Sequence, residues 1–307
     1  MILILRVAAL LAVAAGSPFA GAKLFVNPYS NPAQQAAEWR DLRPADAALI
    51  DKIARQPMAQ WANGPDLDLD ALMTDIDEQQ AMAVLVLYFI PHRDCGLYSR
   101  GGAANAAAYR AYVDRIARAL GKRRAAVIVE PDALPNVAGD CLPAKQDAER
   151  LALLRYAAAK LPNAYIDAGN AVWMPAEQIA ALLKRAGVER ARGFALNVSN
   201  FQTTAASIAY GTKVSKLVGG KHFVIDTSRN GRGPYPRKLW RKPEDEWCNP
   251  PGRALGRPPT AKPGHPLVDA YLWVKVPGES DGECNGAPRA GAWWPEYALG
   301  LARRASW

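Results

Sequence analysis

Residues 125–132 read Ala-Ala-Val-Ile-Val-Glu-Pro-Asp, a nearly continuous apolar run that stops at two acidic residues. Such a run is typical of a parallel strand covered on both faces, since a strand with one wet face would alternate apolar and polar residues. In α/β proteins the carboxyl ends of parallel strands form the face where active sites lie. The stretch therefore predicts a buried strand that delivers Glu130 and Asp132 to that face.

Similar apolar runs recur along the chain and alternate with amphipathic helical patterns. The other predicted strands cover 24–27, 82–90, 164–166, 193–196, 222–225 and 270–274. Helices are predicted over 45–55, 109–120, 151–161, 176–186 and 294–304. This alternation predicts an α/β fold, a distorted parallel β/α barrel of about seven strands that resembles a TIM barrel, with an open doubly wound sheet as the alternative.

Polar residues that a core would reject follow nearly every predicted strand. In chain order they are Arg93 and Asp94, Glu130 and Asp132, Asp167, Asn197 and Asn200, Asp226 and Arg229, and Lys275 and Glu279. Any one of them could be a helix cap or a loop ion-pair partner. Because the carboxyl ends of parallel strands share one face, the set predicts a single polar mouth.

The composition argues against several functional classes. The three histidines have no metal-ligand spacing, and HExxH, P-loop and Gly-x-Ser-x-Gly motifs are missing, so we expect no metal and no cofactor. The net charge of +9 is dispersed without a basic run, so nucleic acid is not an expected partner. Carboxylates without a metal, together with nine tryptophans, are typical of glycosidases, in which one acid protonates the leaving oxygen and another handles water.

The first 22 residues predict an export signal. Arg6 is their one charge, an apolar run follows, and Ala20-Gly21-Ala22 has the small-residue pattern that signal peptidases cut. The apolar run is shorter than the roughly 20 residues that span a bilayer. The alternatives are a membrane anchor and a buried terminal helix. We expect a signal peptide over 1–22, a secreted protein with no membrane partner, and one catalytic domain over 23–307, acting as a monomer.

Four cysteines suit an oxidising compartment and two disulfides. They are Cys95, Cys141, Cys248 and Cys284. Four cysteines allow three pairings. We favour the sequential one, 95 with 141 and 248 with 284, because each pair would tie two loops of one face.

Six segments resemble the signature segments of glycoside hydrolase family 6. They are 93–96 (Arg-Asp-Cys-Gly), 129–135 (Val-Glu-Pro-Asp-Ala-Leu-Pro), 165–169 (Tyr-Ile-Asp-Ala-Gly), 197–201 (Asn-Val-Ser-Asn-Phe), 247–250 (Trp-Cys-Asn-Pro) and 273–282 (Trp-Val-Lys-Val-Pro-Gly-Glu-Ser-Asp-Gly). The resemblance runs in order from about residue 24 to 304. It implies a distorted barrel of about seven parallel strands and hydrolysis of β-1,4-glucan, such as cellulose, with inversion at the anomeric carbon.

The resemblance also implies catalytic roles. Asp132 would be the general acid, and Asp94 would keep it protonated through like-charge repulsion. Asp281 matches the candidate base, although the water's proton could pass through a second water to Asp94 instead. Tyr88 would press on the distorted sugar at the cleavage point, and Arg229 would lie near Asp281.

Other positions carry over as sugar contacts. They are Trp61, Trp173, Trp247 and Trp273 as stacking platforms, Lys275 and Glu279 as hydrogen-bonding groups, Ser99 as a guide for water, Asp167 and Asn200 by their motifs, and Asn170, where many relatives have histidine. Arg93 and Arg229 would give electrostatic support.

Mode of action is predicted from loop length. In exo-acting members of the family that the chain resembles, long loops roof the cleft into a tunnel. Here only residues 285–292 separate Cys284 from Trp293, which is short for such a loop. We therefore expect an open cleft and an endo-acting cellulase. The alternatives are an exo-acting cellobiohydrolase, with 250–266 as a partial lid, a non-catalytic polysaccharide-binding protein on the same barrel, and a hydrolase of another β-glucan.

Overall fold

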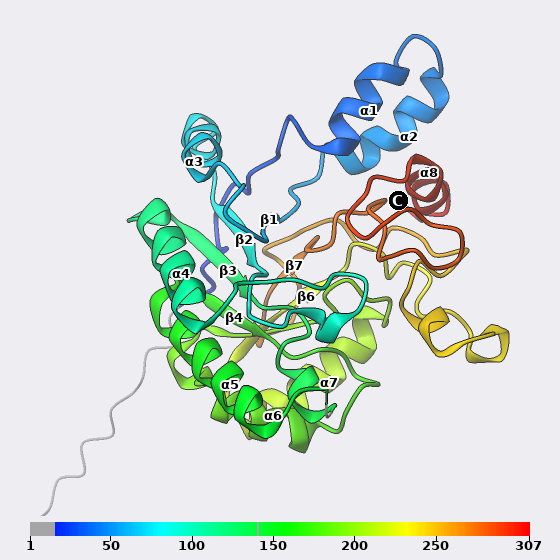
Figure 1. Cartoon of the computed structure of the whole chain (residues 1–307). Helices are drawn as coiled ribbons and strands as arrows, with labels where there is room; N and C mark the ends of the chain where they lie inside the picture. The colour runs from blue at the N-terminus through cyan, green and yellow to red at the C-terminus, as the bar shows by residue number, and fades with distance from the viewer. Residues whose placement is uncertain (1–15, 140) are drawn as a thin grey trace, which may run out of the picture.

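A computed structural model describes residues 16–139 and 141–307 of the chain. Its centre is a parallel sheet whose seven strands follow one another in chain order. They are β1 (Gln60–Ala62), β2 (Ala83–Leu87), β3 (Ala125–Val129), β4 (Ala164–Asp167), β5 (Gly193–Leu196), β6 (His222–Asp226) and β7 (Val268–Leu272). The sheet curls round until an isolated parallel bridge joins Met58, just before β1, to Trp273, just after β7 (Figure 1). The predicted distorted barrel of parallel strands is confirmed.

Eight helices accompany the strands in the described residues. They are α1 (Asn31–Trp39), α2 (Pro44–Ala54), α3 (Leu69–Glu78), α4 (Ala106–Leu120), α5 (Ala144–Lys160), α6 (Ala176–Arg185), α7 (Thr204–Leu217) and α8 (Pro295–Arg303). Helices α3 to α7 lie along the outside of the barrel, whereas α2 packs on both α1 and α8 at one side (Figure 1). Side-chain caps help to set where helices begin, as when Asn105 Oδ1 accepts from the backbone N–H of Ala108 at 2.9 Å at the start of α4.

The strands are apolar on both faces because both faces are buried. Inward-facing residues such as Val84, Val86 and Ile128 pack together inside the barrel. Their neighbours Leu85 and Val127 pack outward beneath the helices. This double burial accounts for the nearly continuous apolar runs.

The prediction of a first strand at 24–27 is wrong. This segment makes only an isolated bridge from Leu24 to Met82, and the first strand is β1, Gln60–Ala62. A strand of three residues is too short to show a period in the sequence. Helices α1, α3 and α7 were also not among the predicted helices.

The predicted export signal lies mostly outside the described residues, but its last residues, 16–22, are described. Phe19 is completely buried at the amino-terminal end of the barrel, and its ring centroid lies 6.1 Å from that of Tyr165 in β4. Ser17 Oγ donates to the carbonyl of Asp269 in β7 at 3.0 Å. Residues near the expected cut therefore pack as part of the folded domain.

Arg124 fixes the same segment from a second side. Its guanidinium donates to the carbonyls of Pro18 at 2.6 Å and Ala20 at 2.5 Å. These contacts hold residues 17–20 against the barrel, and residues 1–15 of the predicted signal lie outside the described part of the chain. None of the helices in the described residues has the length and apolar character needed to cross a membrane.

Candidate active site

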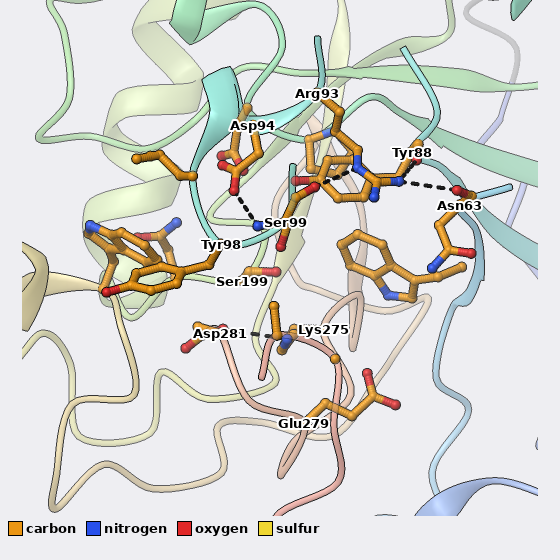
Figure 2. Close-up of a pocket in the computed structure, with 18 of the residues that line it drawn as sticks. Asn63, Tyr88, Arg93, Asp94, Tyr98, Ser99, Ser199, Lys275, Glu279 and Asp281 are labelled. Carbon is orange, nitrogen blue, oxygen red and sulfur yellow. Dashed lines mark hydrogen bonds and ion pairs between the residues drawn. The ribbon is translucent and has the colours of Figure 1, made fainter. Parts of the chain in front are cut away.

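A cleft of about 1220 Å³ crosses the carboxyl-terminal end of the barrel. Its lining includes the predicted residues Trp61, Tyr88, Arg93, Asp94, Ser99, Asp132, Trp173, Asn200, Trp247, Lys275, Glu279 and Asp281. Figure 2 shows Asp94 and Ser99 on one side of this space and Asp281 with Lys275 on the other. The fold thus gathers side chains from the ends of β1, β2, β3, β5 and β7 at one place.

Asp132 lies in the cleft with its backbone fixed from behind. It follows β3, and its N–H donates to Asp167 Oδ2 at 2.9 Å. Burial and the negative charges of Asp167, Asp94 and Asp281 raise the pKa of Asp132 well above its ordinary value. A raised pKa favours the protonated form that a general acid needs.

Asp94 is held by its own loop. Its Oδ2 accepts from the backbone N–H of Ser99 at 2.6 Å, and its φ of 58° is in the left-handed region. Partial burial raises the pKa of Asp94, although the Ser99 N–H and the charge of Arg93 oppose the rise. A higher pKa makes Asp94 a stronger proton acceptor than an ordinary aspartate.

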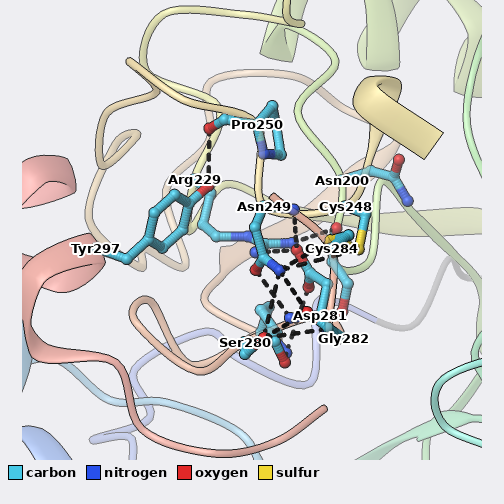
Figure 3. A network of polar contacts seen from close by, with 12 residues as sticks. Asn200, Arg229, Cys248, Asn249, Pro250, Ser280, Asp281, Gly282, Cys284 and Tyr297 are labelled. Carbon is cyan, nitrogen blue, oxygen red and sulfur yellow. Dashed lines mark hydrogen bonds and ion pairs between the residues drawn. A yellow bond between two sulfur atoms is a disulfide. The ribbon is translucent and has the colours of Figure 1, made fainter. Parts of the chain in front are cut away.

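Asp281 has the opposite electrostatic environment. Its Oδ2 accepts from Arg229 Nη1 at 2.7 Å and from the N–H of Asn249 at 3.1 Å (Figure 3). Lys275 Nζ lies 3.4 Å from its Oδ1 (Figure 2). Burial alone would raise the pKa of Asp281, but Arg229 and Lys275 outweigh it and hold the pKa below its ordinary value. Asp281 is therefore ionised and a weak base.

Tyr88 follows β2 and lines the cleft together with Asp94 and Asp132. Its ring meets that of Trp61 edge-on, with centroids 5.3 Å apart, and the Arg93 guanidinium lies 4.7 Å from its ring centroid. Burial and the charges of Asp132 and Asp94 raise the pKa of Tyr88, so its hydroxyl keeps its proton.

The four candidate tryptophan platforms separate into two kinds. Trp61, Trp173 and Trp247 are partly exposed and line the cleft. Trp273 is completely buried, and its indole N–H donates to the carbonyl of Arg257 at 3.0 Å, so the expectation of a platform there is wrong. Its side chain packs beneath α8, where burial of its apolar surface stabilises the fold.

Two expected sugar contacts lie behind the cleft wall. Asp167 is completely buried and supports the backbone of Asp132. Asn170 is 1% exposed, and its Oδ1 accepts from the N–H of Val172 at 3.0 Å. Neither belongs to the lining of the cleft, so both predictions of direct contact with substrate are wrong. The charge of Asp167 acts on Asp132 instead.

The two arginines act by different means. Arg229 is fully buried, pairs with Asp281 and donates to the carbonyl of Ser199. Arg93 makes hydrogen bonds with backbone carbonyls, including those of Tyr88 and Ser99 at 2.7 Å each. Among the described residues Arg93 forms no ion pair with Asp94. Its hydrogen bonds therefore hold the backbone of the loop that carries Asp94, more than they neutralise the Asp94 carboxylate.

Both disulfides join the predicted partners. Cys95 is bonded to Cys141 and Cys248 to Cys284, with Cα atoms 5.9 and 6.2 Å apart. The first anchors the loop that carries Asp94, and the second lies beside Asn249 and Asp281 (Figure 3). The prediction of sequential pairing is confirmed.

Two residues that shape the site were not predicted from the sequence. Asn249 exchanges hydrogen bonds with Asp281, accepting from its N–H through Oδ1 at 2.9 Å while donating its own N–H to the carboxylate. Tyr98 lines the cleft with its ring centroid 6.2 Å from that of Trp247. Asn249 stood within a recognised motif, whereas Tyr98 carried no signal in the sequence.

The arrangement fits acid–base chemistry without a bound ion. Asp132, whose pKa is raised, and Asp281, whose pKa is lowered, share one cleft with aromatic rings suited to sugar faces. No group of three or more His, Cys, Asp or Glu side chains in residues 16–139 and 141–307 has a geometry that could hold a metal.

Comparisons with known proteins agree with this geometry. The chain is 44% identical to endoglucanase A of Cellulomonas fimi over 291 residues, which cover 91% of this chain and 61% of that protein. It is 40% identical to endoglucanase A of Thermobispora bispora over 295 residues, 91% of this chain and 62% of that one. A probable 1,4-β-D-glucan cellobiohydrolase C of Aspergillus terreus is 30% identical over 364 aligned positions, covering 95% of this chain and 76% of that protein. The chain thus spans about three-fifths of the length of the two endoglucanases.

Solved structures carry the same fold. The endoglucanase Cel6 of Mycobacterium tuberculosis, in complex with methyl-cellobiosyl-4-deoxy-4-thio-β-D-cellobioside, is 43% identical with a TM-score of 0.87, covering 94% of this chain and 99% of that one. The family Glycosyl hydrolases family 6 matches residues 19–305. With this match over nearly the whole chain, the protein belongs to glycosyl hydrolases family 6.

Proposed function

We propose that this chain is an inverting endo-β-1,4-glucanase that hydrolyses internal bonds of cellulose and soluble β-glucans, with Asp132 as the general acid. The observation that carries the proposal is the opposite tuning of two carboxyls in one cleft. The pKa of Asp132 is raised and that of Asp281 is lowered, so one holds a proton while the other is ionised. Two carboxyl groups whose pKa values are shifted in opposite directions by their surroundings are typical of glycosidases.

Asp94 is better suited than Asp281 to accept the proton of the attacking water. Arg229 and Lys275 stabilise the ionised form of Asp281, which makes it a poor proton acceptor. Asp94, whose pKa is raised, is the better acceptor for the proton of the attacking water, passed through a second water. Asp281 would then act as an electrostatic organiser of the cleavage point.

Substrate would lie across the aromatic rings of the cleft. Trp61, Trp173 and Trp247 offer faces for stacking of pyranose rings, and Lys275 and Glu279 offer polar contacts to sugar hydroxyls. The complex of the Mycobacterium tuberculosis relative with a thio-linked cellobioside supports a β-1,4-glucan as substrate.

Endo action is supported by the short loops around the cleft of this chain. The alignment with the Aspergillus terreus cellobiohydrolase extends over 364 positions, more than the 307 residues of this chain, so that relative carries inserted residues. The segment between Cys284 and Trp293 is short, and Arg289 and Gly291 within it form part of the cleft wall. The exo-acting alternative requires a roof over the cleft, and residues 250–266, the other candidate lid, contribute nothing to the cleft lining.

We further propose that the protein is exported and acts as a single catalytic domain and a monomer. Two disulfides favour an oxidising compartment. An export signal that ends before Ser17 would leave the packing of Phe19 intact, so we place the end of the signal there and not at Ala22.

Two measurements test the proposal. Proton NMR of the first sugar released from a cello-oligosaccharide should show the α anomer, and a β anomer as first product would contradict inversion. The viscosity of carboxymethyl cellulose should collapse before much reducing sugar appears; a parallel course would favour exo action. A protein that only binds polysaccharide would release no reducing sugar in either assay.

A further inference from the structure

Glu130 lies where β2 and β3 stop pairing. The last paired residues are Leu87 and Val129, and the Glu130 N–H donates to the Leu87 carbonyl at 2.8 Å. Beyond this point the backbone of β2 turns away towards the cleft. The Tyr88 N–H still donates to the Ala62 carbonyl of β1 at 3.0 Å, whereas the N–H groups of Phe89 and Ile90 need partners outside the sheet.

The side chain of Glu130 supplies those partners. Its Oε1 and Oε2 accept from the Phe89 N–H at 3.0 and 3.1 Å, and Oε2 also accepts from the Ile90 N–H at 3.1 Å. Glu130 is completely buried and does not belong to the lining of the cleft, so it cannot touch substrate. Burial raises the pKa of Glu130 to about 7, while the Phe89 and Ile90 N–H groups, Tyr109 and Arg93 counteract the rise.

Arg93 holds the other end of the same segment. Its Nη1 donates to the carbonyls of Tyr88 at 2.7 Å and Asn63 at 3.1 Å, and its Nε donates to that of Ser99 at 2.7 Å (Figure 2). A carboxylate thus receives the N–H groups of 89–90, and a guanidinium donates to carbonyls on both sides of Asp94. These contacts define the path of residues 88–99.

Glu130 also belongs to the rigid turn that carries the acid. It precedes Asp132 by two residues, both have positive φ, 50° and 68°, and its carbonyl accepts from the Ala133 N–H at 3.1 Å. Left-handed backbone at non-glycine residues persists only where the surroundings fix it. The position of the Glu130 carboxylate is therefore tied to that of Asp132.

We propose that Glu130 is a positioning residue, whose carboxylate sets the place of Tyr88 and the Asp94 loop relative to Asp132. It does so by binding the backbone of one segment while being part of the turn that holds the other. Its role in turnover rests on the proposed glucanase function.

The test replaces Glu130 by Gln in the full chain. Glutamine has the same size, but whichever way its amide lies, the NH2 group faces the N–H of Phe89, so one acceptor is lost. Turnover on a soluble cello-oligosaccharide should fall by about 10- to 100-fold, since misplacement of catalytic groups by about an ångström has effects of this size. KM should change by less than about twofold, because the tryptophan platforms are untouched. Hydrogen exchange of the 88–101 backbone should become faster.

Asp269→Asn is the matched control. Asp269 is also a buried carboxylate, bound to Arg192, His222 and Tyr165, but at the opposite end of the barrel. This variant should lose thermal stability while its kcat and the exchange of 88–101 stay as in the wild type. Arg93→Lys keeps the positive charge but loses the guanidinium that donates to several backbone carbonyls at once. This variant should show the same fall in kcat and the same faster exchange of 88–101 as Glu130→Gln.

The outcomes separate the proposals. If Glu130→Gln keeps both kcat and the exchange rate of 88–101, or if Asp269→Asn lowers kcat as much, the positioning role is refuted. If Glu130→Gln does not fold, Arg93→Lys with unchanged kcat and exchange refutes it. If the wild type releases no sugar from β-1,4-glucan, the proposed function fails, and the exchange measurement still decides whether Glu130 holds the loop.

Discussion

Removal of residues 17–22 should destabilise the barrel measurably. Phe19 is completely buried, and a phenylalanine buries about 150–250 Å². At about 25 cal/mol per Å² this corresponds to about 4–6 kcal/mol as an upper value. Measured Phe-to-Ala changes in cores cost about 3–5 kcal/mol. For a domain of nearly 300 residues, whose entropy of unfolding is about 0.6 kcal/mol per kelvin, a loss of about 3–5 kcal/mol lowers the melting temperature by about 5–8 °C.

The assay compares thermal unfolding of chains that begin at Gly16 and at Lys23, followed by circular dichroism. Phe19→Ala in the longer chain should account for most of the difference, and the lost hydrogen bonds of Ser17 and Arg124 for the remainder. Leu42→Ala is the control, because Leu42 is 84% exposed and should shift stability by less than about 0.5 kcal/mol. If the chain from Lys23 melts within about 2 °C of the chain from Gly16, the burial argument is wrong.

Three further predictions concern the cleft and its charges. Asp132→Asn should lower kcat by about 10²- to 10⁴-fold with cello-oligosaccharide binding retained in calorimetry, and near wild-type turnover would remove Asp132 from the mechanism. Arg229→Gln leaves the buried Asp281 without its main partner, so urea unfolding should show a loss of about 3–5 kcal/mol; an unchanged midpoint would contradict the weight given to this pair. Burial raises the pKa values of Glu130 and Asp167 to about 7, from ordinary values of 4.5 and 3.8. Between about pH 4 and pH 7 the folded state therefore binds more protons than the unfolded state. Stability should therefore fall as pH rises from about 4 to 7, and a melting temperature that rises over this range would refute the assignment.

The sequence was most informative where strands are long and apolar. The runs at 125–129 and 82–90 predicted β3 and β2, although β2 ends at Leu87, and the acidic residues after them predicted where Asp94 and Asp132 would lie. The reason is general, since burial on both faces leaves a strong pattern and parallel strands end on one side. In contrast, β1 spans only Gln60–Ala62, too few residues for any pattern.

The sequence was least informative about the direction of side chains in loops. Trp247 and Trp273 stand in equally recognisable motifs, but one lines the cleft and the other is buried under α8. Asn170 points into the protein to cap its own loop. Asn249 supports Asp281 across 32 positions in the chain, a pairing that only the folded backbone defines. Such roles depend on long-range packing, which local residue patterns do not encode.

The place where β1 and β7 meet, called the seam below, lies under the cleft. Trp61 and Gln60 form one lip of the cleft, and Lys275 and Glu279 form the other, so the cleft runs over the seam. The two lips are joined by the Met58–Trp273 bridge and by the hydrogen bond from the Trp61 indole to the Val274 carbonyl, without a continuous ladder. A glucan chain would thus lie over the part of the sheet where the flanking strands share the fewest backbone hydrogen bonds, so widening the cleft there would break fewer of them than separating any other pair of neighbouring strands.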